Sequence, residues 1–167
     1  FVGDIFGAPL AAEAILSFFL ESTFIAVYLF ARDKVPKAVH WFSSLMVAVG
    51  ATMSAFWILV ANSWQQTPAG FVINSELGRA ELDNFWQAVN NPSMFIRFYH
   101  VIDACIIIGA FFLCAIFAYI LIKDRNNEAA RRGIRLALIV ALIASALEAG
   151  PFGDMHARQV ATNQPAK

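Results

Sequence analysis

Four long apolar runs constrain this chain more than any other feature. The first three are longer than the roughly 20 predominantly apolar residues that an α-helix needs to cross a bilayer, whereas the fourth is short and only just reaches the lower end of that range. Composition agrees, because 14% of the residues are charged, where an ordinary soluble domain has about 25%. We therefore predict an all-α integral membrane fold, a single membrane domain with four transmembrane helices. The predicted spans are residues 8–30, 40–64, 94–122 and 133–149.

The charged residues predict how these spans are oriented. Basic residues cluster in the connections at 32–37 and 123–135, whereas the connection at 65–93 carries three acidic residues and one arginine. Because cytoplasmic loops are enriched in lysine and arginine, we expect the first two to be cytoplasmic and 65–93 to be external. The polar tail 150–167 then lies outside, after the fourth span. The apolar spans predict a lipid bilayer as partner. Because the formal net charge is zero, no overall electrostatic field suggests that the chain binds nucleic acid.

Two carboxylates lie inside the first apolar run, at Glu13 and Glu21. A charged group at bilayer depth costs about 3 kcal/mol or more, so such residues are rare there and mark functional sites. On an α-helix the two would lie about 12 Å apart along the axis and about 80° apart around it. Ser54 on the second span is a polar group that would face these glutamates, and a chain of such groups with water is what a proton route through hydrocarbon needs. The alternative for either glutamate is a protonated acid hydrogen-bonded to a neighbouring helix.

The third span contains a histidine, His100, well inside it. Neutral imidazole is a common axial ligand of haem iron, so a haem site is one interpretation. Arg97, one turn earlier, would pair with a haem propionate, and Asp103, one turn later, would orient a ring nitrogen. The other interpretation is a histidine hydrogen-bonded between helices. Glu148 receives no role from the sequence, and His156 is expected to be a solvated loop histidine.

Other chemistry is not indicated by the motifs. Cys105 and Cys114 lie nine residues apart on one predicted helix, too far apart for a disulfide. The sequence has no Cys-His zinc spacing, no glycine-rich dinucleotide motif and no P-loop.

Four strings spread along the chain resemble one known family, and the resemblance covers essentially the whole chain. GDIFGAPLAAEAILSFFLESTF, residues 3–24, resembles the start of the third helix in subunit I of cytochrome bd-type quinol oxidases. SAFWILVANSWQQTP (54–68) resembles the end of the next helix, and FIRFYHV (95–101) resembles the helix with the low-spin haem ligand. GDMHARQVATNQPAK (153–167) resembles the entry to the quinol-binding loop, so 150–167 is expected to begin that loop.

This resemblance implies a quinol:oxygen oxidoreductase of the bacterial plasma membrane. Such an enzyme oxidises quinol and reduces O₂ to water with protons from the cytoplasm, and so contributes to the proton motive force. The implied cofactors are a low-spin haem b, a high-spin haem b and a haem d. The implied partners are subunit II and a small accessory subunit. The chain as given would be a fragment that lacks the N-terminal helices and the C-terminal half, and we expect no activity from it alone.

The resemblance also implies roles for individual residues. His100 would be an axial ligand of the low-spin haem b, with Arg97 also binding the cofactor. Glu13 would be a ligand or immediate neighbour of the high-spin haems. The proton route would include Glu21, Ser22 and Ser54, and the quinol site would begin at Lys167. Two other classes of function remain open on the residues alone: an ion or proton transporter or channel with buried carboxylates, and a haem-binding membrane anchor without oxygen chemistry.

Overall fold

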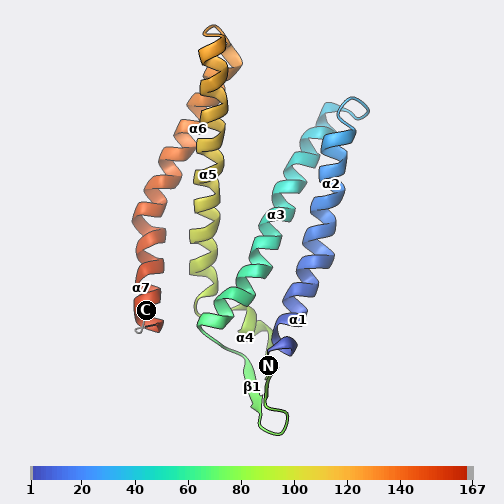
Figure 1. Ribbon diagram of the computed structural model, residues 1–167, viewed down its shortest axis with the longest axis vertical. Helices are drawn as coiled ribbons and strands as arrows, with labels where there is room; N and C mark the ends of the chain where they lie inside the picture. Colours follow the sequence, from blue (N-terminus) through green and yellow to red (C-terminus); the bar gives the residue numbers. More distant parts are fainter. Residues whose placement is uncertain (1, 165–167) are drawn as a thin grey trace. The chain divides into compact units, whose positions relative to one another are not determined.

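The computed structural model describes residues 2–164 and divides into two compact units, Phe1–Phe95 and Ile96–Lys167. The first unit is built on an antiparallel helical hairpin (Figure 1). Its outgoing limb is continuous and consists of α1 (Gly3–Ala12), the π-helical segment η1 (Glu13–Phe18) and α2 (Phe19–Phe30). Its return limb is α3 (Lys37–Gln66). Proline at position 36 has an extended conformation, with φ −56° and ψ 149°, so it separates the turn from the helix that follows.

A small cap closes the end of this hairpin where α1 begins and α3 ends. It contains the antiparallel strands β1 (Phe71–Asn74) and β2 (Arg79–Leu82), followed by the short helix α4 (Phe85–Val89). The sequence predicted only a loop over 65–93. Elements of four or five residues are too short to produce a readable hydrophobic periodicity, which is why they were not predicted.

Side chains from both helices and from the cap form a common core. Trp64 at the end of α3 is 5% exposed, and its indole Nε1 donates to the carbonyl oxygen of Ala69 at 2.8 Å. The side chain of Asp4 on α1 accepts the backbone N–H of Leu82 at 2.8 Å. Gly70 has a φ of +66°, and a Cβ there would lie 2.4 Å from the carbonyl oxygen of Asn84. These contacts fix the cap against the end of the hairpin.

The second unit is also a helical hairpin. It contains most of α5 (Met94–Lys123), then α6 (Glu128–Leu147), the π-helical segment η2 (Glu148–Phe152) and α7 (Gly153–Asn163). The side chain of Asn127 caps α6 by accepting the N–H of Ala130 at 3.0 Å. The two limbs pack closely, because a Cβ at Gly133 would lie 2.4 Å from the ring of Phe117.

The last helical limb extends further than the sequence predicted. We expected the fourth span to end at 149 and a polar loop to follow, but the limb continues to Asn163. Gly150, with φ −97° and ψ −107°, bends the helix just before Pro151. A Cβ at Gly153 would lie 2.4 Å from the carbonyl oxygen of Glu148, so this bend requires glycine there. The helix therefore continues through Pro151 with a kink.

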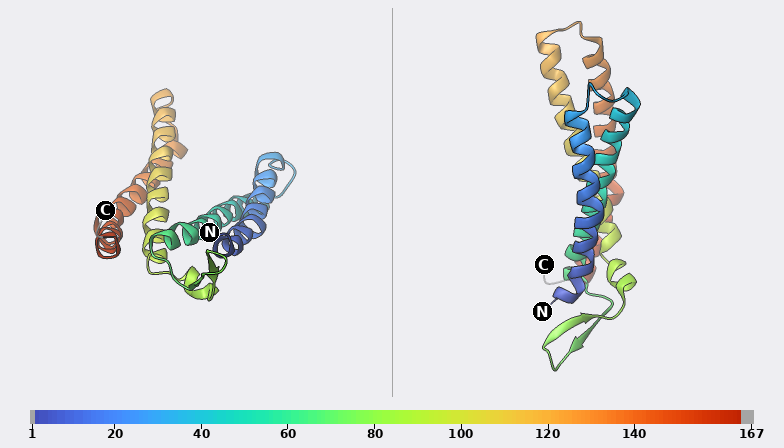
Figure 2. Two further views of the ribbon diagram at one scale, coloured as in Figure 1. Left: turned by 60° about the horizontal axis from the view of Figure 1, so that its bottom comes forward. Right: turned by 90° about the vertical axis from the view of Figure 1, so that its right-hand side faces the viewer.

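Four helical limbs within residues 2–164 are long and apolar enough to cross a membrane, as the sequence predicted. Their outer surfaces carry many exposed large apolar side chains, which a bilayer would cover. Figure 2 gives two further views of each hairpin. The limbs are Gly3–Phe30, Lys37–Gln66, Met94–Lys123 and Glu128–Asn163.

Candidate functional site: buried acids and a paired histidine

Glu13 is joined to the opposite helix of the first unit. It lies at the start of η1, and its carboxylate oxygen Oε1 accepts a hydrogen bond of 2.8 Å from the hydroxyl of Ser54 on α3. Both side chains are partly buried. The structure therefore brings together two of the residues that the sequence predicted for haem binding and proton transfer. It also gives the carboxylate a polar partner inside an apolar limb, which lowers the cost of placing it there.

The π-helical segment changes the relation between Glu13 and Glu21. In an unbroken α-helix the two would lie about 80° apart around the axis, as the sequence analysis assumed. A π-turn contains one extra residue, so the eight-residue step rotates as seven α-helical residues do, and the two positions come to within about 20°. The expected separation of 80° is therefore wrong. Both carboxylates lie on the face of the limb that packs against α3.

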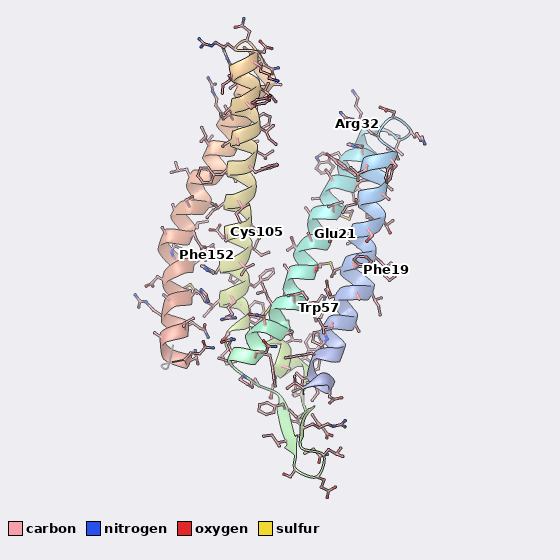
Figure 3. The ribbon with its side chains drawn as sticks, in the orientation of Figure 1. Phe19, Glu21, Arg32, Trp57, Cys105 and Phe152 are labelled. Atoms are coloured by element: carbon pink, nitrogen blue, oxygen red, sulfur yellow. The ribbon has the colours of Figure 1, made fainter. Side chains whose placement is uncertain are left out.

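Gly50 on α3 makes room for Glu21. A Cβ at Gly50 would lie 3.0 Å from the Cβ of Glu21 and 3.1 Å from its backbone nitrogen, so the helices approach closely here. Glu21 lies near the middle of the hairpin (Figure 3), whereas Phe19, two residues earlier, is on the outer side and 62% exposed. Ser54 is four residues from Gly50, one turn along α3. Glu13 and Glu21 therefore face two successive turns of the same helix.

Ser22 and Ser17, both near these acids, have opposite environments. Ser22, which the sequence predicted on the proton route, is exposed, and its hydroxyl donates to the carbonyl oxygen of Phe18 in its own helix at 2.7 Å. In this unit it does not join Glu13 or Glu21. Ser17 lies within η1 and is fully buried, and its hydroxyl has no hydrogen-bond partner. In the sequence, Ser17 stands midway between Glu13 and Glu21, and that position was the usable signal for it.

In the second unit, the structure pairs His100 with two residues from the last limb. Nδ1 of His100 on α5 lies in contact with Oε1 of Glu148 in η2. The ring of His156 on α7 lies beside it, with 4.4 Å between ring centroids. One turn away, Tyr99 stacks on Phe152 with 6.0 Å between centroids. Glu148 and His156 thus both lie beside α5, one before and one after the bend at Gly150.

Two expectations about this cluster are wrong. The carboxylate at the ring nitrogen of His100 is that of Glu148, whereas Asp103 was expected there. Asp103 is only 5% exposed, and its Oδ2 atom has no hydrogen-bond partner. His156 is half-buried on a helix and not a solvated loop residue. The pairing of Glu148 with His100 was hidden because the two residues are 48 positions apart and belong to different elements.

The remaining predicted residues are placed as follows. Arg97 lies on α5, one turn before His100. Lys167, predicted at the quinol site, lies outside the described residues. Cys105 and Cys114 are free thiols, as expected. Within residues 2–164, no group of three or more histidine, cysteine, aspartate or glutamate side chains is arranged to hold a metal ion by itself.

Comparison with known proteins agrees with the family resemblance. The family model for cytochrome bd terminal oxidase subunit I matches residues 1–167. The chain is 43% identical over 167 residues to cytochrome bd ubiquinol oxidase subunit 1 of Bacillus subtilis (strain 168), and covers 35% of that protein. It is 38% identical over 167 residues to cytochrome bd-II ubiquinol oxidase subunit 1 of Escherichia coli (strain K12), and covers 32% of it. In both cases all of this chain is matched.

Two conclusions follow from the match and the fold together. The chain spans about a third of the length of these relatives, as the resemblance led us to expect. Its four long apolar helical limbs make it an all-α, multi-pass membrane protein. The sequence prediction of the family is confirmed, because the match extends over the whole chain: it belongs to the cytochrome bd terminal oxidase subunit I family.

Proposed function

We propose that this chain is the part of a quinol:oxygen oxidoreductase subunit that carries one haem ligand, one acid at the high-spin haems and a segment of the proton route. The family match over residues 1–167 is the observation that carries this proposal. The complete enzyme would oxidise quinol, reduce O₂ to water and take up protons from the cytoplasm. Its partners would be subunit II and a small accessory subunit, in a bacterial plasma membrane.

His100 fits the role of axial ligand to the low-spin haem b. Its Nδ1 atom is held by Glu148, so Nε2 is the nitrogen left to bind iron. Buried polar atoms without a hydrogen-bond partner lie on the neighbouring side chains, at Oε2 of Glu148, Nε2 of His156 and Oδ2 of Asp103. Because buried polar atoms ordinarily have hydrogen-bond partners, these atoms are expected to gain theirs from a group outside the described residues, such as the cofactor. Arg97, one turn from His100, would bind a propionate, because guanidinium matches carboxylate geometry.

Glu13 fits a place beside the high-spin haem b and haem d. The hydrogen bond from Ser54 occupies only Oε1, so Oε2 remains for iron or for a proton. Bound haems supply the electron transfer and the oxygen chemistry. This chain's residues then orient the ligands, exclude water from the apolar limbs and hold protons at the carboxylate oxygens. A protonated acid held by Ser54 for structure alone is the competing interpretation.

Glu21 and Ser54 fit a proton route toward Glu13. The π-turn aligns the two glutamates on the α3 face, and Ser54 can both donate and accept a hydrogen bond. With loops 32–37 and 123–135 in the cytoplasm, Glu21 would lie nearer the proton source than Glu13. Ser22 would join the route only through a group outside the first unit, because its hydroxyl is bonded within its own helix.

We place the quinol site on the external side, with loop 65–93 and the tail 150–167. Lys167 would donate a hydrogen bond to a quinol oxygen, since an ammonium group is only a donor. It would also stabilise negative charge as the quinol loses its protons.

The experiment that tests the proposal uses the intact complex purified in detergent. A visible spectrum with the bands of haem b and haem d, together with quinol-dependent O₂ consumption, is the expected result. A complex without haem absorbance would point to a transporter or channel. Haem b absorbance without haem d or O₂ consumption would point to a membrane anchor. Either of these last two results would contradict the proposed function.

A further inference from the structure

We propose that Ser17 is a proton-relay residue between Glu21 and Glu13. This inference rests on the proposed function and adds a residue to its proton route. Its basis is a buried hydroxyl without a partner, placed by a π-turn between two acids. Each of these features comes from the first unit alone.

The environment of Ser17 is unusual for its limb. Its exposed fraction is 0%, although its neighbours Ile15, Leu16 and Phe18 are 62%, 52% and 59% exposed. The η1 segment packs against α3. The one fully buried side chain of η1 therefore lies in the contact with α3, on the same side as Glu13 and Glu21. Figure 1 shows this limb running alongside α3.

The hydroxyl of Ser17 is left without a partner by the local backbone. A helical serine ordinarily donates to a carbonyl oxygen one turn earlier, as Ser43 does to Val39 at 2.8 Å. The Oγ atom of Ser17 is buried without any such bond. A buried, unpaired polar group costs about 1–3 kcal/mol, which a water molecule or another polar group would offset. A hydroxyl held in this way is available to a chain of hydrogen bonds.

The separation of Glu13 and Glu21 along the helix axis requires an intermediate group for proton transfer between them. With the π-turn, the backbone positions of Glu13 and Glu21 are separated by about seven α-helical rises, or about 10.5 Å along the axis, which is too far for direct proton transfer. Ser17 is four residues from each, so it divides this separation into two gaps of about 5 Å. A single water molecule spans such a gap, because two hydrogen bonds of about 2.8 Å cover it. The serine hydroxyl accepts a proton from one side as it donates its own to the other, so it is unchanged at the end.

The close approach at Gly50 fits the same route. A Cβ at Gly50 would lie only 3.0 Å from the Cβ of Glu21, so a bulkier residue than glycine would crowd α3 against α2 at this end. Ser54 at the other end holds Oε1 of Glu13. Ser17 lies between these two contacts. The route Glu21, Ser17, Glu13 therefore runs along the face of the limb that packs against α3.

Ser17→Ala in the full subunit, studied in the intact complex, tests the inference. We expect a normal content of each haem, a severalfold fall in kcat for quinol-dependent O₂ consumption and a larger slowing in D₂O than the wild type shows. Ser43→Ala is the matched control. Ser43 is equally buried on the same hairpin, but its hydroxyl is bonded within its own helix, so we expect wild-type kcat and isotope effect.

Outcomes that overturn the inference are distinct from failure of the proposed function. An inactive wild-type complex would contradict the proposed function itself. An active wild type with equal kcat and isotope effect in Ser17→Ala would remove Ser17 from the route and leave the function standing. If Ser17→Ala loses haem, Ser17→Cys is measured instead, because a thiol has similar size and is a weak donor. Slow turnover with haem retained then supports the relay, and wild-type turnover overturns it.

Discussion

Nδ1 of His100 lies against the carboxylate of Glu148, across the two limbs of one helical hairpin. A carboxylate in contact with one ring nitrogen fixes the orientation of the ring and makes the other nitrogen a stronger electron donor. Glu148 is thus a positioning residue for the proposed haem ligand. The return limb packs against α5, and Glu148 at the start of η2 lies on it opposite His100.

Replacing Glu148 should change the low-spin haem b and leave the other haems intact. Glu148→Gln keeps the size of the side chain but removes its charge, so the ferric form loses stabilisation and the midpoint potential of this haem should rise. Glu148→Ala should weaken binding of the haem by about 10–100-fold. A redox titration followed by absorbance measures both. Asp154→Asn is the control, because that carboxylate is exposed and paired with Arg158. Equal potentials in all the proteins would contradict the positioning role.

His100→Ala in the full subunit should abolish the low-spin haem b signal. Imidazole is the axial ligand that this chain offers within the third predicted span, and alanine has no atom that binds iron. The haem d band should survive, because the proposed high-spin haems are held elsewhere. Absorbance spectra of reduced and oxidised membranes make the comparison. An unchanged low-spin spectrum would show that His100 has only the structural role that the sequence left open.

The features that a sequence encodes locally were the ones that could be predicted. The four helical limbs were predictable, because each limb has enough apolar residues to give a clear signal by itself. The family was predictable from four local strings. The sequence predicted that Ser54 is a polar group able to face the acids. It could not predict the specific contact with Glu13, because a sequence does not set the register of two packed helices.

Three features were beyond the sequence for identifiable reasons. The π-turn at Glu13 adds one residue to a turn, and no residue type in EAILSF demands that. The fourth span was expected to end at 149 because the residues from 150 onward are polar, whereas the helix only bends at Gly150 and continues. The pair His100 and Glu148 joins residues 48 positions apart on different elements, so no local pattern encodes the contact. The π-turn therefore hid the alignment of the acids, and the long sequence separation hid the partner of the histidine.

Glu13→Ala should reduce or abolish incorporation of the high-spin haems. The alanine removes the carboxylate that we place beside them, and leaves the hydroxyl of Ser54 without its acceptor. Haem content per subunit, measured by extraction and by the haem d absorbance, tests this directly. Full content of all haems in Glu13→Ala would favour the interpretation of Glu13 as a structural acid held by Ser54.

Glu21→Gln should affect turnover more than haem content. Glutamine is close in size to glutamate, so it should fit against Gly50, but it does not titrate and interrupts proton transfer. We expect more haem to remain than in Glu13→Ala, with oxidase activity lost. Quinol-dependent O₂ consumption and a haem spectrum on the same sample separate the two effects. An active Glu21→Gln complex would mean that protons reach the haems by another route.

Lys167→Ala tests the proposed quinol site, which lies outside the described residues. The variant removes the ammonium donor that we place at a quinol oxygen, and a hydrogen bond to a charged group contributes about 1.5–3 kcal/mol. The apparent KM for quinol should therefore rise about tenfold or more in the intact complex. Haem content should be unchanged, because His100 and Glu13 are intact. Lys123→Ala, at the end of α5, is a control for loss of a single lysine charge. Equal KM and kcat in Lys167→Ala and wild type would remove Lys167 from the site, and would assign quinol binding to residues that follow it in the longer relatives.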